Sequence, residues 1–140
     1  MPVRVTWEDD AHTILRSDTY GEWDWIDYYQ SLDEVKRCIE SVPHRVDLIC
    51  TRQPDAVSPP GSLLPHLIRA VSLVPRSLNT VVIVSQKPSA QALFGLFQLM
   101  RQRQAESTKV LVVPTLEEAF TMLADRRASP ALLASPAVGE

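Results

Sequence analysis

Residues 46–66 read VDLICTRQPDAVSPPGSLLPH, and this stretch decides how the rest of the chain is interpreted. A continuous apolar run at residues 46–50 ends in a polar loop broken by prolines, and a second apolar run begins behind Ser62. Apolar runs without alternation are typical of strands covered on both faces in a parallel sheet. Ser is a preferred first residue of helices, so Ser62 indicates the start of a helix. The stretch therefore predicts one strand–loop–helix unit of an α/β fold.

The same unit recurs twice towards the C-terminus. TVVIV at residues 80–84 and VLVV at 110–113 are short β-branched runs, each followed by a helical pattern. SAQALFGLFQLMRQR at residues 89–103 is apolar around most of its circumference. TLEEAFTMLADRR at 115–127 opens with Thr115 and Glu118, the spacing of a capping box. These patterns predict two more buried strands and two more helices.

The N-terminal part predicts a hairpin and a helix. VRVTWE at residues 3–8 alternates apolar and polar residues, and HTILRSDTY at 12–20 resumes β-forming residues after a polar turn. Residues 22–42 change to helical periodicity, with Asp24 as the N-cap and Asp27 three residues later. The complete order predicts an α/β fold with a mixed sheet of about five strands, formed by an N-terminal hairpin and βα units, and four helices. We expect one domain at residues 1–127 and a disordered tail at 128–140, which is rich in Ala, Ser and Pro.

Composition limits the class of function. The chain has 140 residues, 45% of them hydrophobic, and a net charge of −3, which indicates a globular protein without general affinity for nucleic acid. No apolar run is long enough for a membrane span, and MPVRVTWEDD at the start lacks a signal-peptide pattern, so we expect a cytoplasmic protein. The two cysteines and three histidines lack metal-site spacing, and no G-x-G-x-x-G element is present, so neither a metal nor a cofactor is predicted.

Four segments carry a family resemblance: VTWEDDAHTILR, GEWDWIDYY, SVPHRVDLIC and TLEEAFTML. With their order, they resemble the STAS-type domain, specifically its SpoIIAA-like bacterial members, over residues 3–127. The resemblance implies a non-enzymatic protein-interaction and regulatory module, switched in the anti-sigma-factor antagonists by phosphorylation of a serine after the third strand. The motif there resembles D-x-S-x-x-D-S, which this sequence lacks; Ser58 and Ser62 are its only serines near that position. Relatives that carry a SEC14-like description imply an alternative, a carrier of lipid or another small apolar ligand.

Four residues are candidates for contact with an anion. Ser58 and Ser62 are possible phosphoacceptors, and Arg52 and Lys87 follow strands whose carboxyl ends should share one edge of the sheet. The alternative is an N-cap role for Ser62 and solvated loop positions for the two cations. Ser62 and His66 lie one helical turn apart but lack a third orienting group, so no catalytic residue is predicted.

Four aromatic residues are candidates for an interface: Trp23, Tyr28, Phe94 and Phe97. Trp and Tyr are enriched at binding hot spots, although packing in the core would also account for them. Because Trp23 and Trp25 are two positions apart, we expect them to point in different directions on a helix. The apolar circumference of residues 89–103 indicates a helix that is deeply buried or that docks on another subunit or an acyl ligand, and we expect self-association, as a dimer, through it.

Overall fold

The computed structural model describes residues 2–61, 64–73, 75, 77–86 and 109–128. Its elements, in chain order, are β1 (Val3–Trp7), β2 (Ile14–Thr19), α1 (Trp25–Glu40), β3 (Val46–Arg52), α2 (Leu64–Leu73), β4 (Leu78–Val84), β5 (Lys109–Val113) and α4 (Leu116–Ala128). The strands form a mixed sheet in the order β1-β2-β3-β4-β5, in which β1 is antiparallel to β2 and the other neighbours are parallel. The predicted α/β class, N-terminal hairpin and five-stranded mixed sheet are confirmed.

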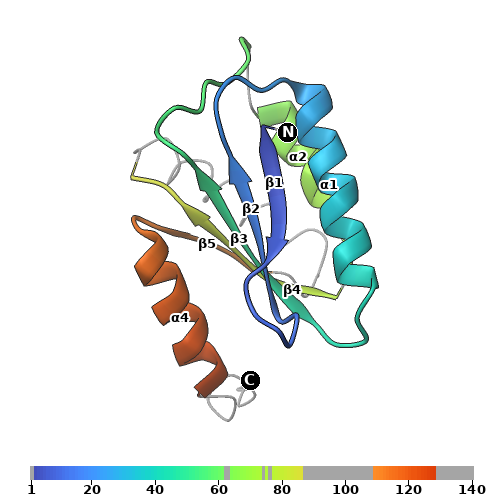
Figure 1. Ribbon diagram of the computed structural model, residues 1–140, viewed down its shortest axis with the longest axis vertical. Coiled ribbons are helices and arrows are strands. Elements are labelled where there is room, and N and C mark those ends of the chain that lie inside the picture. The colour runs from blue at the N-terminus through green and yellow to red at the C-terminus, as the bar shows by residue number, and fades with distance from the viewer. Residues whose placement is uncertain (1, 62–63, 74, 76, 87–108, 129–140) are drawn as a thin grey trace.

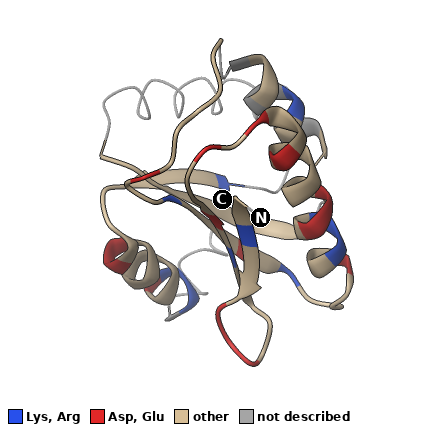
Figure 2. Cartoon of the chain, turned by 45° about the horizontal axis from the view of Figure 1, so that its top comes forward, with Lys and Arg blue, Asp and Glu red and all other residues tan. Residues whose placement is uncertain are grey.

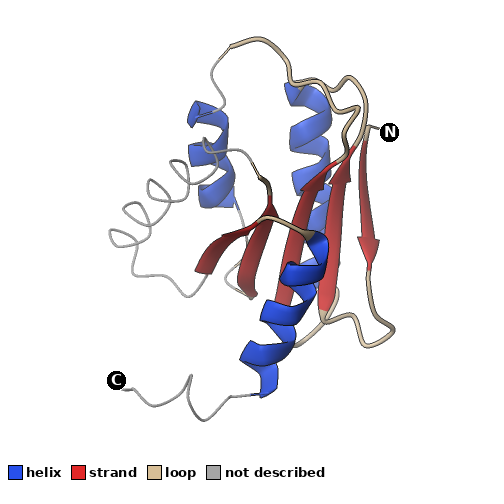
Figure 3. Cartoon of the chain, turned by 90° about the vertical axis from the view of Figure 1, so that its left-hand side faces the viewer, coloured by secondary structure: helices blue, strands red, loops and turns tan. Residues whose placement is uncertain are grey.

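The helices cover both faces of the sheet. Helices α1 and α2 lie on one side and α4 lies on the other (Figures 1 and 3). The helix predicted at residues 89–103 lies outside the described residues, so the description supports three helices and not the predicted four. The predicted tail lies almost wholly outside the description as well. No helix in the described ranges is long and apolar enough to cross a membrane.

Strand β3 supplies side chains to two hydrophobic cores. Leu48 packs with Val35 and Ile39 of α1, whereas Ile49 packs with the α4 side. Neighbouring strand residues point to opposite faces, so a strand covered on both sides needs apolar residues at successive positions. The run VDLIC, in which Asp47 is the one polar residue, meets this requirement. The second core consists of Ile49, Val82, Val113, Ala119 and Leu123.

The predicted capping box of α1 is complete, and the predicted pair of Thr115 and Glu118 is in contact at the start of α4. The Asp24 carboxylate accepts a hydrogen bond from the Asp27 N–H at 2.8 Å, and the Asp27 carboxylate accepts one from the Asp24 N–H at 3.0 Å. Before α4, the Thr115 hydroxyl accepts from the Glu118 N–H at 3.1 Å and donates to the Glu118 carboxylate at 3.2 Å. These bonds satisfy N–H groups that the first helical turn leaves unpaired. The helix starts are therefore set by residues three positions apart.

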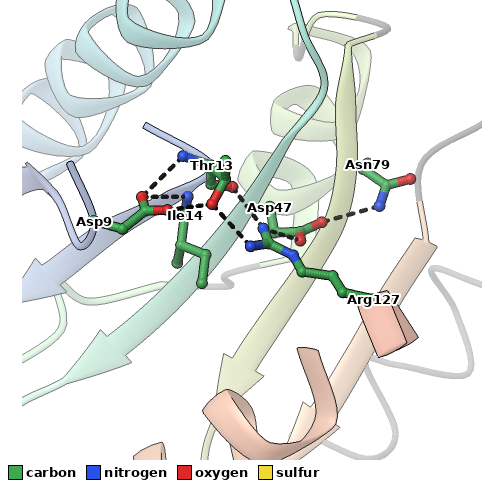
Figure 4. Close-up of polar contacts among 6 residues, drawn as sticks. All are labelled: Asp9, Thr13, Ile14, Asp47, Asn79 and Arg127. Atoms are coloured by element: carbon green, nitrogen blue, oxygen red, sulfur yellow. Dashed lines mark hydrogen bonds and ion pairs between the residues drawn. The ribbon is translucent and has the colours of Figure 1, made fainter. Parts of the chain in front are cut away.

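A polar network holds the C-terminal end of α4 against the sheet (Figure 4). The Arg127 guanidinium contacts the Asp47 carboxylate at 2.8 Å and donates to the hydroxyl and carbonyl oxygens of Thr13 at 2.8 and 3.0 Å. The side-chain amide of Asn79 donates to the other Asp47 oxygen at 3.0 Å. Asp47 is 4% exposed, so its charge depends on these partners. The network links α4 to residues at the start of β2, β3 and β4.

Replacing Arg127 tests the contribution of this network to stability. We expect Arg127→Met to lower the free energy of unfolding by about 1–3 kcal/mol, because it removes charge-assisted hydrogen bonds to a buried carboxylate while keeping an apolar stem. Arg126→Met, at the neighbouring position, is the control and should change stability by less than about 0.5 kcal/mol. Urea unfolding followed by circular dichroism measures both variants. Equal stability of the two variants would contradict the structural role of Arg127.

Candidate functional site

Two loops meet beside the carboxyl ends of β2 and β3. Glu22 and Val57 form an isolated parallel bridge. The Val57 N–H donates to the Gly21 carbonyl at 2.7 Å, and the Trp23 N–H donates to the Val57 carbonyl at 3.5 Å. Gly21 has a φ of +53°, a left-handed conformation that glycine adopts without steric cost. The loop after β3 is thus held against the start of α1, at the edge where α/β folds bind ligands.

An aromatic cluster lies at this junction. Trp23 contacts Trp25 edge-to-face with ring centroids 5.0 Å apart, and Tyr28 lies 6.0 Å from Trp23 and 5.4 Å from Trp25. The prediction that Trp23 and Trp25 point apart is wrong, because Trp23 precedes the N-cap Asp24 and belongs to extended chain rather than to the helix. Trp23 and Tyr28 occupy the positions of a hydrophobic staple, which fixes the direction of the chain into the helix.

His66 connects this cluster to α2. Its ring stacks on Trp25 with centroids 3.7 Å apart, and its Nδ1 lies 2.8 Å from the Tyr29 hydroxyl. The Arg69 guanidinium lies over the Tyr29 ring, 5.5 Å from its centroid. His66 therefore has a structural partner on α1, while Ser62, its neighbour in the sequence pattern, lies outside the described residues.

Two large apolar side chains at the junction are exposed. Ile26, in the first turn of α1, is 68% exposed, and Val57 is 56% exposed. Ile26 directly follows Trp25 of the aromatic cluster in the sequence. The Val57 carbonyl accepts a hydrogen bond from the N–H of Trp23. We call Trp23, Ile26 and Val57 the corner surface. Exposed apolar residues that gather at one place are typical of a binding surface, whereas single ones are ordinary.

An arginine and a serine lie beside the corner surface. The Arg52 guanidinium donates to the Ser58 hydroxyl at 2.6 Å, and Ser58 directly follows Val57. The structure thus brings together Arg52 and Ser58, two of the four residues predicted for an anion contact. It also places Trp23 and Tyr28, two predicted interface residues, at the same junction. Ser62, Lys87, Phe94 and Phe97 lie outside the described residues.

The sequence interpretation did not single out Ile26 and Val57, and it considered His66 only together with Ser62. Ile26 could have been found, because it is a large apolar residue on the polar face of α1. Val57 could also have been found as the one large aliphatic residue of the loop after β3. Nothing local could have paired His66 with Tyr29, since they are 37 positions apart and on different helices.

Burial raises the pKa of two groups near the junction, Cys50 and Tyr28. Burial, with a smaller effect of the Asp18 carboxylate, raises the pKa of the Cys50 thiol to about 12. Burial also raises the pKa of Tyr28. A thiol with so high a pKa is a poor nucleophile at neutral pH. Within the described ranges, no three His, Cys, Asp or Glu side chains are grouped as a metal site would require.

The contact between Tyr29 and His66 can be tested by removing one hydroxyl group. We expect Tyr29→Phe to lower the free energy of unfolding by about 0.5–1.5 kcal/mol, because a hydrogen bond between α1 and α2 is lost. Tyr28→Phe is the matched control, since it removes a hydroxyl for which no described residue is a hydrogen-bond partner. Urea unfolding measures both. A larger loss in Tyr28→Phe than in Tyr29→Phe would contradict this assignment.

Comparison with known proteins adds no relative: no known family matches the sequence, and no curated protein does either.

Proposed function

We propose that the chain is a non-enzymatic protein-interaction and regulatory module, similar to a STAS domain, and that its partner binds the corner surface. The observation that carries the proposal is the bridge between Glu22 and Val57, which holds exposed Val57 beside Trp23, three residues before exposed Ile26 in the first turn of α1. The STAS resemblance of the sequence gives independent support. A hairpin followed by parallel βα units is compatible with that resemblance.

The corner surface is suited to binding because it is already ordered. The Trp23 ring packs against the rings of Tyr28 and Trp25. Its backbone N–H donates a hydrogen bond to the carbonyl of Val57 in the loop after β3. A surface that is rigid before association loses less conformational entropy when the partner binds. Aromatic anchors surrounded by aliphatic contacts are also the usual composition of binding hot spots.

Arg52 and Ser58 provide the regulatory element of the proposal. A phosphate on Ser58 would keep the Arg52 guanidinium as a charged partner and add a charge of about −1.5 to −2 next to Val57. Arginine binds phosphate oxygens strongly and with defined geometry. Phosphorylation would therefore change the charge of the binding surface without requiring a change of fold. The same Arg52 could bind an anionic group of the partner.

The alternative function, a carrier of lipid or another small apolar ligand, has weaker support. A carrier needs an enclosed apolar pocket between the sheet and the helices. The groove of about 460 Å³ between β1 and α1 is lined by Asp33, Glu34 and Arg37 among others. Charged side chains of both signs do not suit an acyl chain. Native mass spectrometry of the purified protein would reveal a bound acyl molecule if the carrier hypothesis were right.

The partner can be captured by photocrosslinking in the cell of origin. With benzoylphenylalanine at position 26 or 57, we expect one crosslinked protein common to both positions. Leu73, 46% exposed and located on α2, is the matched control position and should not crosslink to that protein. Crosslinking of the same protein from position 73, or of no protein from positions 26 and 57, would contradict the proposal.

Substitutions then test the contribution of the corner surface to affinity. We expect Ile26→Asp and Val57→Asp each to weaken binding of the captured partner by about 30-fold, which is typical of hot-spot residues. Leu73→Asp should change the affinity by less than about twofold. Calorimetric titration gives the affinities, and circular dichroism establishes that each variant is folded.

The regulatory element makes a separate prediction. We expect a phosphate on Ser58 in protein isolated from its native cell, and an affinity for the partner that differs about tenfold or more between the phosphorylated and unmodified forms. In Arg52→Met this difference should be smaller, because the phosphate loses its cation. Phosphopeptide mapping that finds Ser58 and Ser62 unmodified under all growth conditions would overturn this part of the proposal.

A further inference from the structure

Strand β1 has an unpaired edge among the described residues. It pairs with β2 on one side only, and it is the first strand of the sheet order. The Pro2 carbonyl accepts from the Tyr20 N–H at 2.6 Å, and the Glu8 N–H donates to the Ile14 carbonyl at 2.8 Å. Backbone groups alternate in direction along an antiparallel strand, so the even-numbered residues of β1 bond to β2. The N–H and C=O groups of Val3, Val5 and Trp7 therefore face the open edge, ready to pair with another strand.

The side chains along this edge are self-complementary in charge. Arg4 and Thr6 of β1 and Glu8, directly after it, are exposed. By the alternation of the strand, which the Glu8 N–H continues with its bond to the Ile14 carbonyl, they lie on one face, with the two opposite charges placed symmetrically about Thr6. If a second copy pairs antiparallel with a two-fold axis at Thr6, Arg4 lies opposite the partner's Glu8, and the contact occurs twice. An axis at Val5 would instead place Arg4 opposite the partner's Thr6. Opposite charges facing each other across strands are stabilising and like charges are not, so the charges favour the axis at Thr6.

The same register also matches the backbone. It places Val5 opposite the partner's Trp7, and both residues direct their N–H and C=O groups to the open edge. On the other face, α1 borders β1 along the groove, where Glu34 and Arg37 form an exposed ion pair. Acidic and basic residues lie side by side along α1 (Figure 2), so an antiparallel second α1 would meet charges of both signs. On both faces of the β1 edge, acidic and basic side chains are mixed. A second copy therefore does not meet a surface of one charge sign that would repel it.

We propose that two copies of this chain associate through antiparallel pairing of their β1 edges about a two-fold axis at Thr6, and thereby form one continuous sheet. The contact is isologous, as expected for a dimer with two-fold symmetry. This dimer uses neither the corner surface nor the helix expected at residues 89–103. It therefore does not rest on the proposed function, and its failure would leave that proposal intact.

A charge exchange tests the register. Sedimentation velocity and light scattering of the full chain should show a dimer, and Arg4→Glu or Glu8→Arg alone should raise its dissociation constant about tenfold, because each places like charges opposite each other twice. The double variant Arg4→Glu/Glu8→Arg should restore the dissociation constant to within about twofold. Within one chain, Arg4 lies over the Tyr20 ring and Glu8 pairs with Arg16, and the exchange restores neither contact. Recovery therefore reports pairing between copies, and circular dichroism establishes that the variants are folded.

A disulfide tests the position of the axis. Directly opposite residues that do not exchange backbone hydrogen bonds have Cα atoms about 4.5 Å apart, which lies within the range of a disulfide. Under mild oxidation we expect Thr6→Cys to form a covalent dimer, and we expect no such dimer from Arg4→Cys or from the native chain, whose Cys38 and Cys50 are partly buried. The proposal is overturned by a monomer at about 100 µM, by a dimer insensitive to both charge reversals, or by equal crosslinking of Thr6→Cys and Arg4→Cys.

Discussion

Burial of β3 on both faces is the constraint on which the described structure depends. Leu48 requires a helix on one side of the sheet and Ile49 requires one on the other, because each side chain is almost wholly removed from water. Helix α1 meets the first requirement and α4 the second. The hairpin strand β1 needs only one covered face, so its residues alternate between buried and exposed. The layered arrangement of the domain follows from these two requirements.

Asp47 is the exception in that buried strand, and its charge pairs with the last turn of α4. A buried carboxylate is tolerated only with partners, which here come from Arg127, 80 positions away, and from Asn79. The hydrophobic contacts of α4 hold the helix on the sheet, but they specify its direction and position less closely than a directional ion pair does. Apolar packing and one polar network thus have separate roles on the same face.

The candidate site shows how far prediction from sequence extends. Arg52, Ser58, Trp23 and Tyr28 were each predicted as possible contacts, from loop position or aromatic character alone. Their presence at one junction was not predicted, because it depends on hydrogen bonds between residues 21–23 and Val57, which are more than 30 positions apart. The prediction that Trp23 and Trp25 point in different directions was wrong, because the helical spacing rule was applied across the N-cap. Residues near a helix start obey the geometry of the loop up to the cap.

The sequence by itself determined the hairpin, the buried parallel strands and the helix starts at Asp24 and Thr115. These features depend on periodicity and on hydrogen bonds between residues a few positions apart, so a short window contains the relevant information. Only the tertiary structure decided the sheet order, the partner of Asp47, the contact of His66 with Tyr29, and the open edge of β1. Those features join distant segments, and many pairings would satisfy the same local patterns. The choice among them depends on packing of the whole domain at once.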